Sequence, residues 1–93
     1  MNRAVDPIAA VRSNFLARCQ RDVAVLETAL ASPDPTSRDA IKLTVHRLSG
    51  AAGVFGFAAI GVMAAALDDV MQDGEDPEPA EVKALVDAVK AIL

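Results

Sequence analysis

The chain has one histidine, His46, and its neighbours at helical spacing are the residues best suited to chemistry. On a helix of about 100° per residue, the side that carries this histidine also carries Lys42, Ser49, Gly50 and Gly53. Glycine in a helix costs on the order of 1 kcal/mol relative to alanine, so two glycines here indicate that another molecule must approach closely. A neutral imidazole is a nucleophile near physiological pH, and a phosphorylated ring nitrogen readily passes its phosphoryl group on. The pattern predicts a histidine presented for phosphoryl transfer.

Length and composition predict one small all-α domain over residues 1–93. The chain is 53% apolar, which is ample for a helical core, and it contains no Trp or Tyr. A net charge of −4 argues against nucleic-acid binding, which needs a basic face, and favours a protein partner with a complementary patch. Cys19 is the only cysteine, so an internal disulfide is excluded and a reducing, cytoplasmic location is expected. Charge at Arg12 interrupts the N-terminal segment, which is therefore a poor signal peptide.

Prolines and glycines divide the chain into four amphipathic helices. We expect these helices over residues 7–31, 37–55, 57–73 and 77–93. Signals for helix starts are found at Asp6 with Pro7, at Thr36 or Ser37, and at Asp76 with Pro77. Gly56 is well placed to end the second helix in a left-handed turn. Short loops between four such helices predict an antiparallel up-down-up-down four-helix bundle.

Each predicted helix has one apolar stripe that is expected to face the core. In the first helix the stripe is Ile8, Val11, Phe15, Cys19, Leu26 and Leu30. In the second helix it is Ile41, Val45, Leu48, Ala52 and Phe55. The inner side of the third helix is Ile60, Met63, Ala64, Leu67 and Met71, and the fourth helix buries Val82, Leu85, Val86, Val89 and Ile92. His46 lies about 140° from the stripe of its own helix, which predicts that its side chain is exposed.

The outer side of the third helix is expected to be small and apolar with acid at one end. It consists of Ala58, Gly61, Val62, Ala65, Asp68 and Asp69. We interpret the two aspartates as a solvated face rather than an acid/base pair. Arg47 points about 100° away from His46 and is likewise interpreted as a solvated charge. One histidine and one cysteine on a buried stripe do not make a metal site, so none is expected.

A membrane span is an alternative for the uncharged stretch of 20 residues from Leu48 to Leu67. Its four glycines and seven alanines make this stretch weakly hydrophobic, and the bundle needs its apolar residues to complete a core. We therefore favour the bundle.

The run HRLSGAAGVFG resembles the signature of the histidine-containing phosphotransfer (HPt) domain. That signature is roughly H-x-L-K-G, a run of small residues, and a glycine ten positions after the histidine. The positions that match in spacing are His46, Leu48, Gly50, Ala51, Ala52 and Gly56. The departure is Ser49, where the family usually has a lysine that helps to neutralise the phosphoryl group. Lys42 lies one turn earlier on the same face and is expected to take over part of that role, while Ser49 can donate a hydrogen bond.

The resemblance implies a role as a phosphotransfer intermediate with no kinase active site of its own. By this resemblance, His46 is expected to accept a phosphoryl group from the aspartate of a response-regulator receiver domain and to pass it to another receiver. A hybrid sensor kinase is a further partner that the resemblance implies. The chain is expected to hold no cofactor, because the receiver supplies the Mg²⁺. The expected docking surface consists of Leu43, Gly50, Gly53, Ala58, Val62 and Ala65. We expect a monomer that binds neither nucleic acid nor membrane.

Three other functions stay open at this point. The first is the dimerisation and phosphoacceptor domain of a sensor kinase, which normally has an acidic residue after the histidine, whereas this chain has Arg47. The second is an HPt-like adaptor that binds receivers without accepting phosphate, because the usual lysine is missing. The third is a plain helical interaction module in which His46 is incidental.

Overall fold

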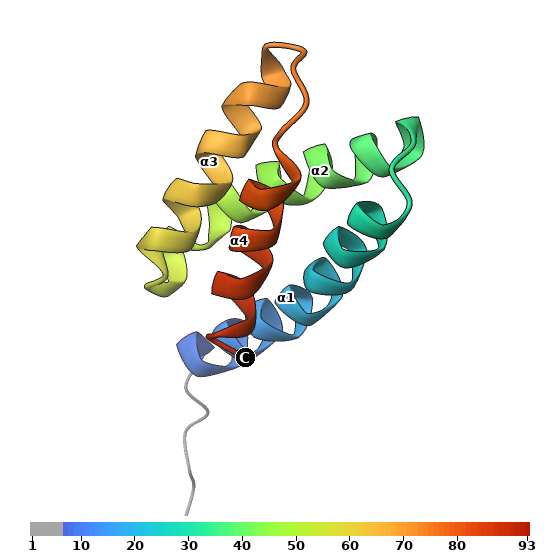
Figure 1. Cartoon of the computed structure of the whole chain (residues 1–93). Helices are drawn as coiled ribbons and strands as arrows, with labels where there is room; N and C mark the ends of the chain where they lie inside the picture. Colours follow the sequence, from blue (N-terminus) through green and yellow to red (C-terminus); the bar gives the residue numbers. More distant parts are fainter. Residues whose placement is uncertain (1–6) are drawn as a thin grey trace, which may run out of the picture.

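The computed structural model describes residues 7–93, and all regular secondary structure in that range is helical (Figure 1). The elements are α1 (Pro7–Ala31), α2 (Pro35–Ala51), the single 3₁₀ turn η1 (Gly53–Phe55), α3 (Ala58–Gln72) and α4 (Pro79–Lys90). This confirms the all-α prediction with four α-helices in the described range. The antiparallel up-down-up-down order stays a prediction, and the predicted cap at Asp6 lies outside the described residues.

α2 begins two residues earlier than predicted, because Asp34 caps it in place of Thr36 or Ser37. The backbone of Asp34 is extended, and its Oδ1 accepts a hydrogen bond of 2.8 Å from the amide of Ser37. Pro35 occupies the first turn, where a missing N–H costs nothing. The predicted start at residue 37 was therefore wrong.

α4 starts at Pro79 and ends at Lys90, so it is shorter than the predicted range 77–93. Glu78 precedes a proline, which disfavours the helical conformation, and its ψ of 133° is extended. Pro77 and Asp76 consequently lie in the connection from α3 rather than at a helix start.

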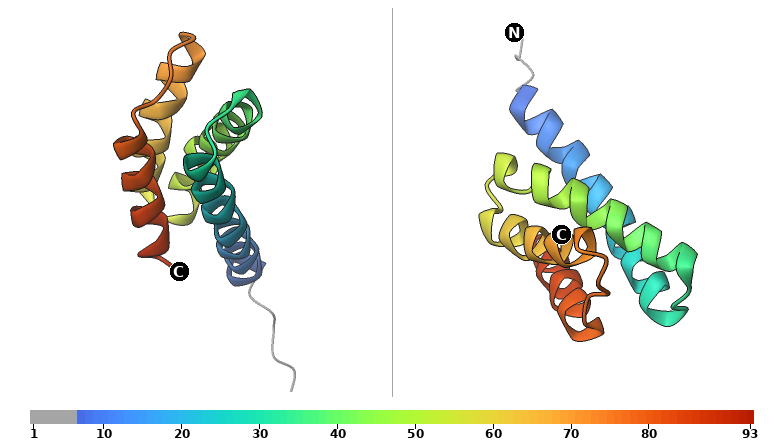
Figure 2. Two further views of the ribbon diagram at one scale, coloured as in Figure 1. Left: turned by 45° about the vertical axis from the view of Figure 1, so that its right-hand side comes forward. Right: turned by 90° about the horizontal axis from the view of Figure 1, so that it is seen from above.

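Two helical layers pack against each other, with α1 and α2 in one and α3 and α4 in the other (Figure 2). The buried core takes residues from all four helices, among them Leu26, Val45, Leu48, Ala64, Leu67, Leu85 and Val89. The predicted stripe of α1 is wrong at Ile8 and Val11, which are exposed. α1 has 25 residues whereas the other helices have 17, 15 and 12, so the first turns of α1 extend beyond their partners.

The chain turns sharply between α2 and α3. Gly56 has φ = 89°, the left-handed conformation predicted for it, but α2 itself ends at Ala51 and Gly53 starts η1. The rings of Phe55 and Phe57 stack on Phe15 of α1, with centroid separations of 4.7 and 5.9 Å. These contacts hold the turn on the bundle.

The membrane alternative fails, because the stretch Leu48–Leu67 is divided between α2, η1 and α3. Within residues 7–93 we find no helix with the length and hydrophobicity needed to cross a bilayer.

Candidate functional site

His46 lies near the middle of α2 with its side chain 65% exposed. Its neighbours in sequence at the core side, Val45 and Leu48, are buried. The predicted exposure is therefore confirmed. It follows from the helical period, because a residue about 140° from the buried stripe is turned away from the core.

One carboxylate contacts the imidazole. The Nδ1 atom of His46 lies 3.0 Å from Oδ2 of Asp68 on α3, and the Asp68 side chain is only 13% exposed. An ionised carboxylate only accepts hydrogen bonds, so this contact assigns the ring proton to Nδ1. Nε2 is then the ring nitrogen with a free lone pair, on a side chain that is mostly exposed.

The sequence interpretation of Asp68 as part of a solvated face was wrong, although Asp69 is exposed as expected. The reason lies at Gly61, which is buried rather than on the outer side. A Cβ atom placed on Gly61 would lie 3.5 Å from the backbone nitrogen of Gly53, so α3 passes close to the end of α2 there. Asp68 follows seven residues later and lies on nearly the same side of α3. This side faces α2, so Asp68 lies next to His46.

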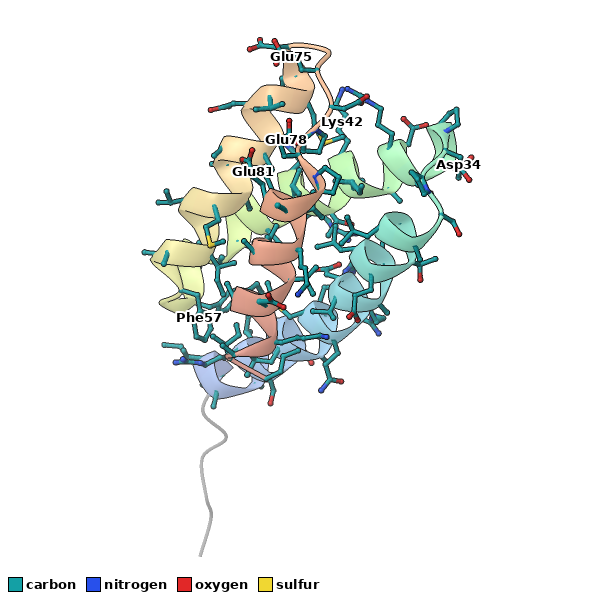
Figure 3. All side chains as sticks on the ribbon, in the orientation of Figure 1. Asp34, Lys42, Phe57, Glu75, Glu78 and Glu81 are labelled. Atoms are coloured by element: carbon teal, nitrogen blue, oxygen red, sulfur yellow. The ribbon has the colours of Figure 1, made fainter. Side chains whose placement is uncertain are left out.

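The two residues predicted to support a phosphoryl group differ in their surroundings. The hydroxyl of Ser49 donates a 2.7 Å hydrogen bond to the backbone carbonyl of His46, so its proton is already engaged within α2. Lys42 is half-buried on α2 (Figure 3). It precedes His46 by four residues, which is about 6 Å along a helix axis. No ion pair joins Lys42 to a carboxylate within residues 7–93. The phosphate-supporting roles of both residues stay predictions.

The surface predicted for docking is open. A Cβ atom at Gly50 or Gly53 would meet nothing within 4 Å. Leu43, Ala58 and Val62 are exposed and Ala65 is half-buried. Sequence reasoning missed Val54, which is 77% exposed, because it treated η1 as a continuation of the helix. Whether these residues bind a receiver stays a prediction.

Arg47 is not a solvated charge. Its Nη2 atom lies 2.8 Å from Oδ1 of Asp22 on α1, and Asp22 is buried. Burial raises the pKa of Asp22, and the nearby guanidinium groups of Arg47 and Arg18 offset only part of that increase. The pair joins α2 to α1 and fixes the rotation of the helix that presents His46.

A comparison with known protein families matches residues 10–93 to the Hpt domain. No curated protein and no solved structure matches the chain. The match covers α2, α3, α4 and all of α1 after its first three residues, and it includes the exposed histidine of α2 and the aspartate of α3 that contacts it. The chain therefore belongs to the Hpt domain family and takes part in phosphotransfer signalling.

Proposed function

We propose that this protein is a phosphotransfer intermediate of a two-component phosphorelay. His46 accepts a phosphoryl group from the aspartyl phosphate of one receiver domain and donates it to the aspartate of another. The observation that carries this proposal is the exposed imidazole with Nδ1 bound to Asp68, because this arrangement leaves the Nε2 lone pair available to a partner.

The chemistry follows from the assignment of the ring proton. Nε2 attacks phosphorus in line, a P–N bond forms, and the P–O bond to the receiver aspartate breaks, so that its carboxylate leaves with the bonding electrons. The ring retains its proton on Nδ1 and becomes positively charged. Asp68, 3.0 Å from Nδ1, offsets that charge and holds the ring in orientation. Attack by the aspartate of a second receiver reverses these changes and restores neutral His46.

The receiver supplies the Mg²⁺ and most of the stabilisation of the transferring group. This chain supplies the nucleophile and an unobstructed surface next to it on which the receiver can dock. The open space at Gly50 and Gly53 lets receiver loops approach, and the exposed side chains of Leu43 and Val62 offer apolar contact. Such an encounter is transient, so we expect a small interface of modest affinity. A monomer in the cytoplasm fits a chain whose one cysteine is a buried thiol.

The test is transfer from receivers charged with radiolabelled phosphate. We expect acid-labile label on the wild-type chain and none on His46→Gln, which retains a polar side chain but no nucleophilic ring. Label on His46→Gln, or acid-stable label, would contradict the proposal.

An HPt-like adaptor is a second candidate, and the hydrogen bond of Ser49 favours it. The position that usually carries a lysine holds a hydroxyl already donated to the backbone. The adaptor predicts receiver binding without label, and binding of the same affinity by His46→Gln. Binding measured beside the transfer assay therefore separates the two functions.

A further inference from the structure

Asp68 has a second contact, through the carboxylate oxygen that does not touch the imidazole. Its Oδ2 atom lies 3.0 Å from Nδ1 of His46, and its Oδ1 atom lies 3.4 Å from Nε2 of Gln72, the last residue of α3. The amide NH₂ of glutamine donates and an ionised carboxylate only accepts, so Gln72 is the donor. Both oxygens of this carboxylate, whose side chain is only 13% exposed, are therefore engaged.

Gln72 lies on the side of α3 that faces α2. At about 100° per residue, its direction is within about 20° of Gly61 and about 40° of Asp68. Gly61 is the residue at which α3 passes close to Gly53 at the end of α2. Gln72 therefore continues the row of residues that brings Asp68 to His46.

Three contacts fix the register of this row. They are Gly61 with Gly53, Asp68 with His46, and Asp76 with Arg38. From one contact to the next, the residue number on the α3 side rises by the same step as the number on α2 falls. Gln72, one turn beyond Asp68, therefore lies at the level of Lys42.

The donor to Asp68 at this level is neutral. Within residues 7–93, neither Lys42 nor any other lysine or arginine forms an ion pair with Asp68. A lysine or arginine in the place of Gln72 would offset part of the carboxylate charge, whereas an amide can orient the carboxylate without neutralising it. The negative charge of Asp68 is thus left to act on His46.

We propose that Gln72 is a positioning residue, which holds the carboxylate of Asp68 in the orientation that keeps the ring proton of His46 on Nδ1. Without this donor the carboxylate can turn about its terminal bond, so that Nδ1 loses an aligned acceptor for part of the time. The ring proton then lies more often on Nε2, which removes the lone pair from that nitrogen. The effect on the ring proton needs no receiver, whereas its consequence for phosphoryl transfer rests on the proposed function.

The test compares Gln72→Met with Gln20→Met. Methionine keeps the length and helix propensity of glutamine but has no donor, and Gln20 is an exposed glutamine on α1. The position of the ring proton is read from the nitrogen shifts of the neutral imidazole in the isotope-labelled full chain. We expect the ratio of Nδ1-protonated to Nε2-protonated ring to fall about two- to threefold in Gln72→Met, because the lost hydrogen bond is long and exposed. The ratio should stay unchanged in Gln20→Met.

Gln72→Lys tests whether the donor itself is needed. A lysine four residues after an aspartate can donate to its carboxylate, so the ratio should stay within about 1.5-fold of the wild type. Thermal unfolding checks that every variant is folded. The proposal is overturned by equal ratios in Gln72→Met and the wild type, or by an equal fall in both methionine variants. A fall in Gln72→Lys as large as that in Gln72→Met also overturns it.

Transfer from a radiolabelled receiver is measured on the same proteins. The rate of transfer to Gln72→Met should fall about twofold, in step with the loss of the Nδ1-protonated ring. A wild-type chain that acquires no label would refute the proposed function, while the ring proton would still decide the role of Gln72. Normal labelling of the wild type, together with an unchanged ring proton in Gln72→Met, would refute the role of Gln72 alone.

Discussion

Asp68→Asn tests whether the carboxylate beside His46 acts in phosphoryl transfer. The phosphorylated ring is positively charged, and Asp68 Oδ2 lies 3.0 Å from Nδ1. Two unit charges at that distance attract by about 5 kcal/mol at an effective dielectric constant of about 20. The His46 side chain is 65% exposed, so water screens most of this attraction. We take about 1.4 kcal/mol, or a factor of about ten, as the contribution that remains.

Asparagine also changes which ring nitrogen carries the proton. Its amide group can turn and donate an N–H to Nδ1, which places the ring proton on Nε2 and removes the lone pair that attacks phosphorus. The lost charge and the altered tautomer both disfavour phosphorylation of His46. We therefore expect both the transfer rate and the equilibrium fraction of phosphorylated His46 to fall about tenfold or more.

The assay is rapid-quench transfer from a radiolabelled receiver, with the tautomer read from the NMR shifts of the ring nitrogens. Asp69→Asn is the matched control, because it removes the same charge from an exposed neighbouring residue. Unchanged rates and an unchanged tautomer in Asp68→Asn would refute the reasoning. An equal loss in both variants would assign the effect to net charge rather than to the contact with Nδ1.

Four further predictions concern single positions. Gly50→Leu should slow transfer at least about tenfold by crowding the partner, while the melting temperature stays equal or rises by a few degrees, because the added side chain meets nothing within 4 Å. Ser49→Lys should shift the phosphoryl-transfer equilibrium between receiver and His46 toward phosphorylated His46 by at most about fivefold, and by less in high salt, because the new cation is exposed. No shift would mean that the receiver alone neutralises the charge of the phosphoryl group. Burial raises the pKa of Cys19 to about 11, so alkylation of the folded chain at pH 8 should be slower than alkylation of the unfolded chain by about 100-fold or more. The free energy of unfolding should also fall as pH rises from about 9 to 11, because in that range only the unfolded chain has lost the thiol proton. Arg47→Met should cost about 2 kcal/mol in denaturant unfolding, because Asp22 is then left buried without its closest cation; a loss below about 0.5 kcal/mol would mean that the pair does not hold α2 on α1.

Helical periodicity predicted the features that depend on one helix at a time. The exposure of His46 follows from its angle to the stripe that includes Val45 and Leu48, and all three lie where predicted. Gly56 could be placed because a helix that must reverse direction needs a left-handed residue, and glycine adopts this conformation without strain.

Contacts between helices could not be predicted in the same way. A helical wheel gives the direction of Asp68 on α3 but not the rotation of α3 against α2, which is set by the close approach at Gly61. The pairing of Arg47 with Asp22 was missed for a similar reason, because a charge at the edge of a stripe is solvated or paired according to the neighbouring helix. Helix starts were missed where Asp34 and Glu78 stand before a proline, since several cap signals compete within a few residues.

Under the proposed function, the charges around His46 stabilise the imidazole ring more than the phosphoryl group. Asp68 offsets the positive ring from the Nδ1 side, whereas the hydroxyl of Ser49 is donated to the backbone and Lys42 lies one turn away. Among residues 7–93, a phosphoryl group of about −1.5 to −2 charges therefore has no cation immediately beside it. The receiver carries its own metal ion and cations, so it holds the group more tightly. The equilibrium should then lie toward the receivers, which suits a domain that passes the phosphoryl group on rather than one that stores it.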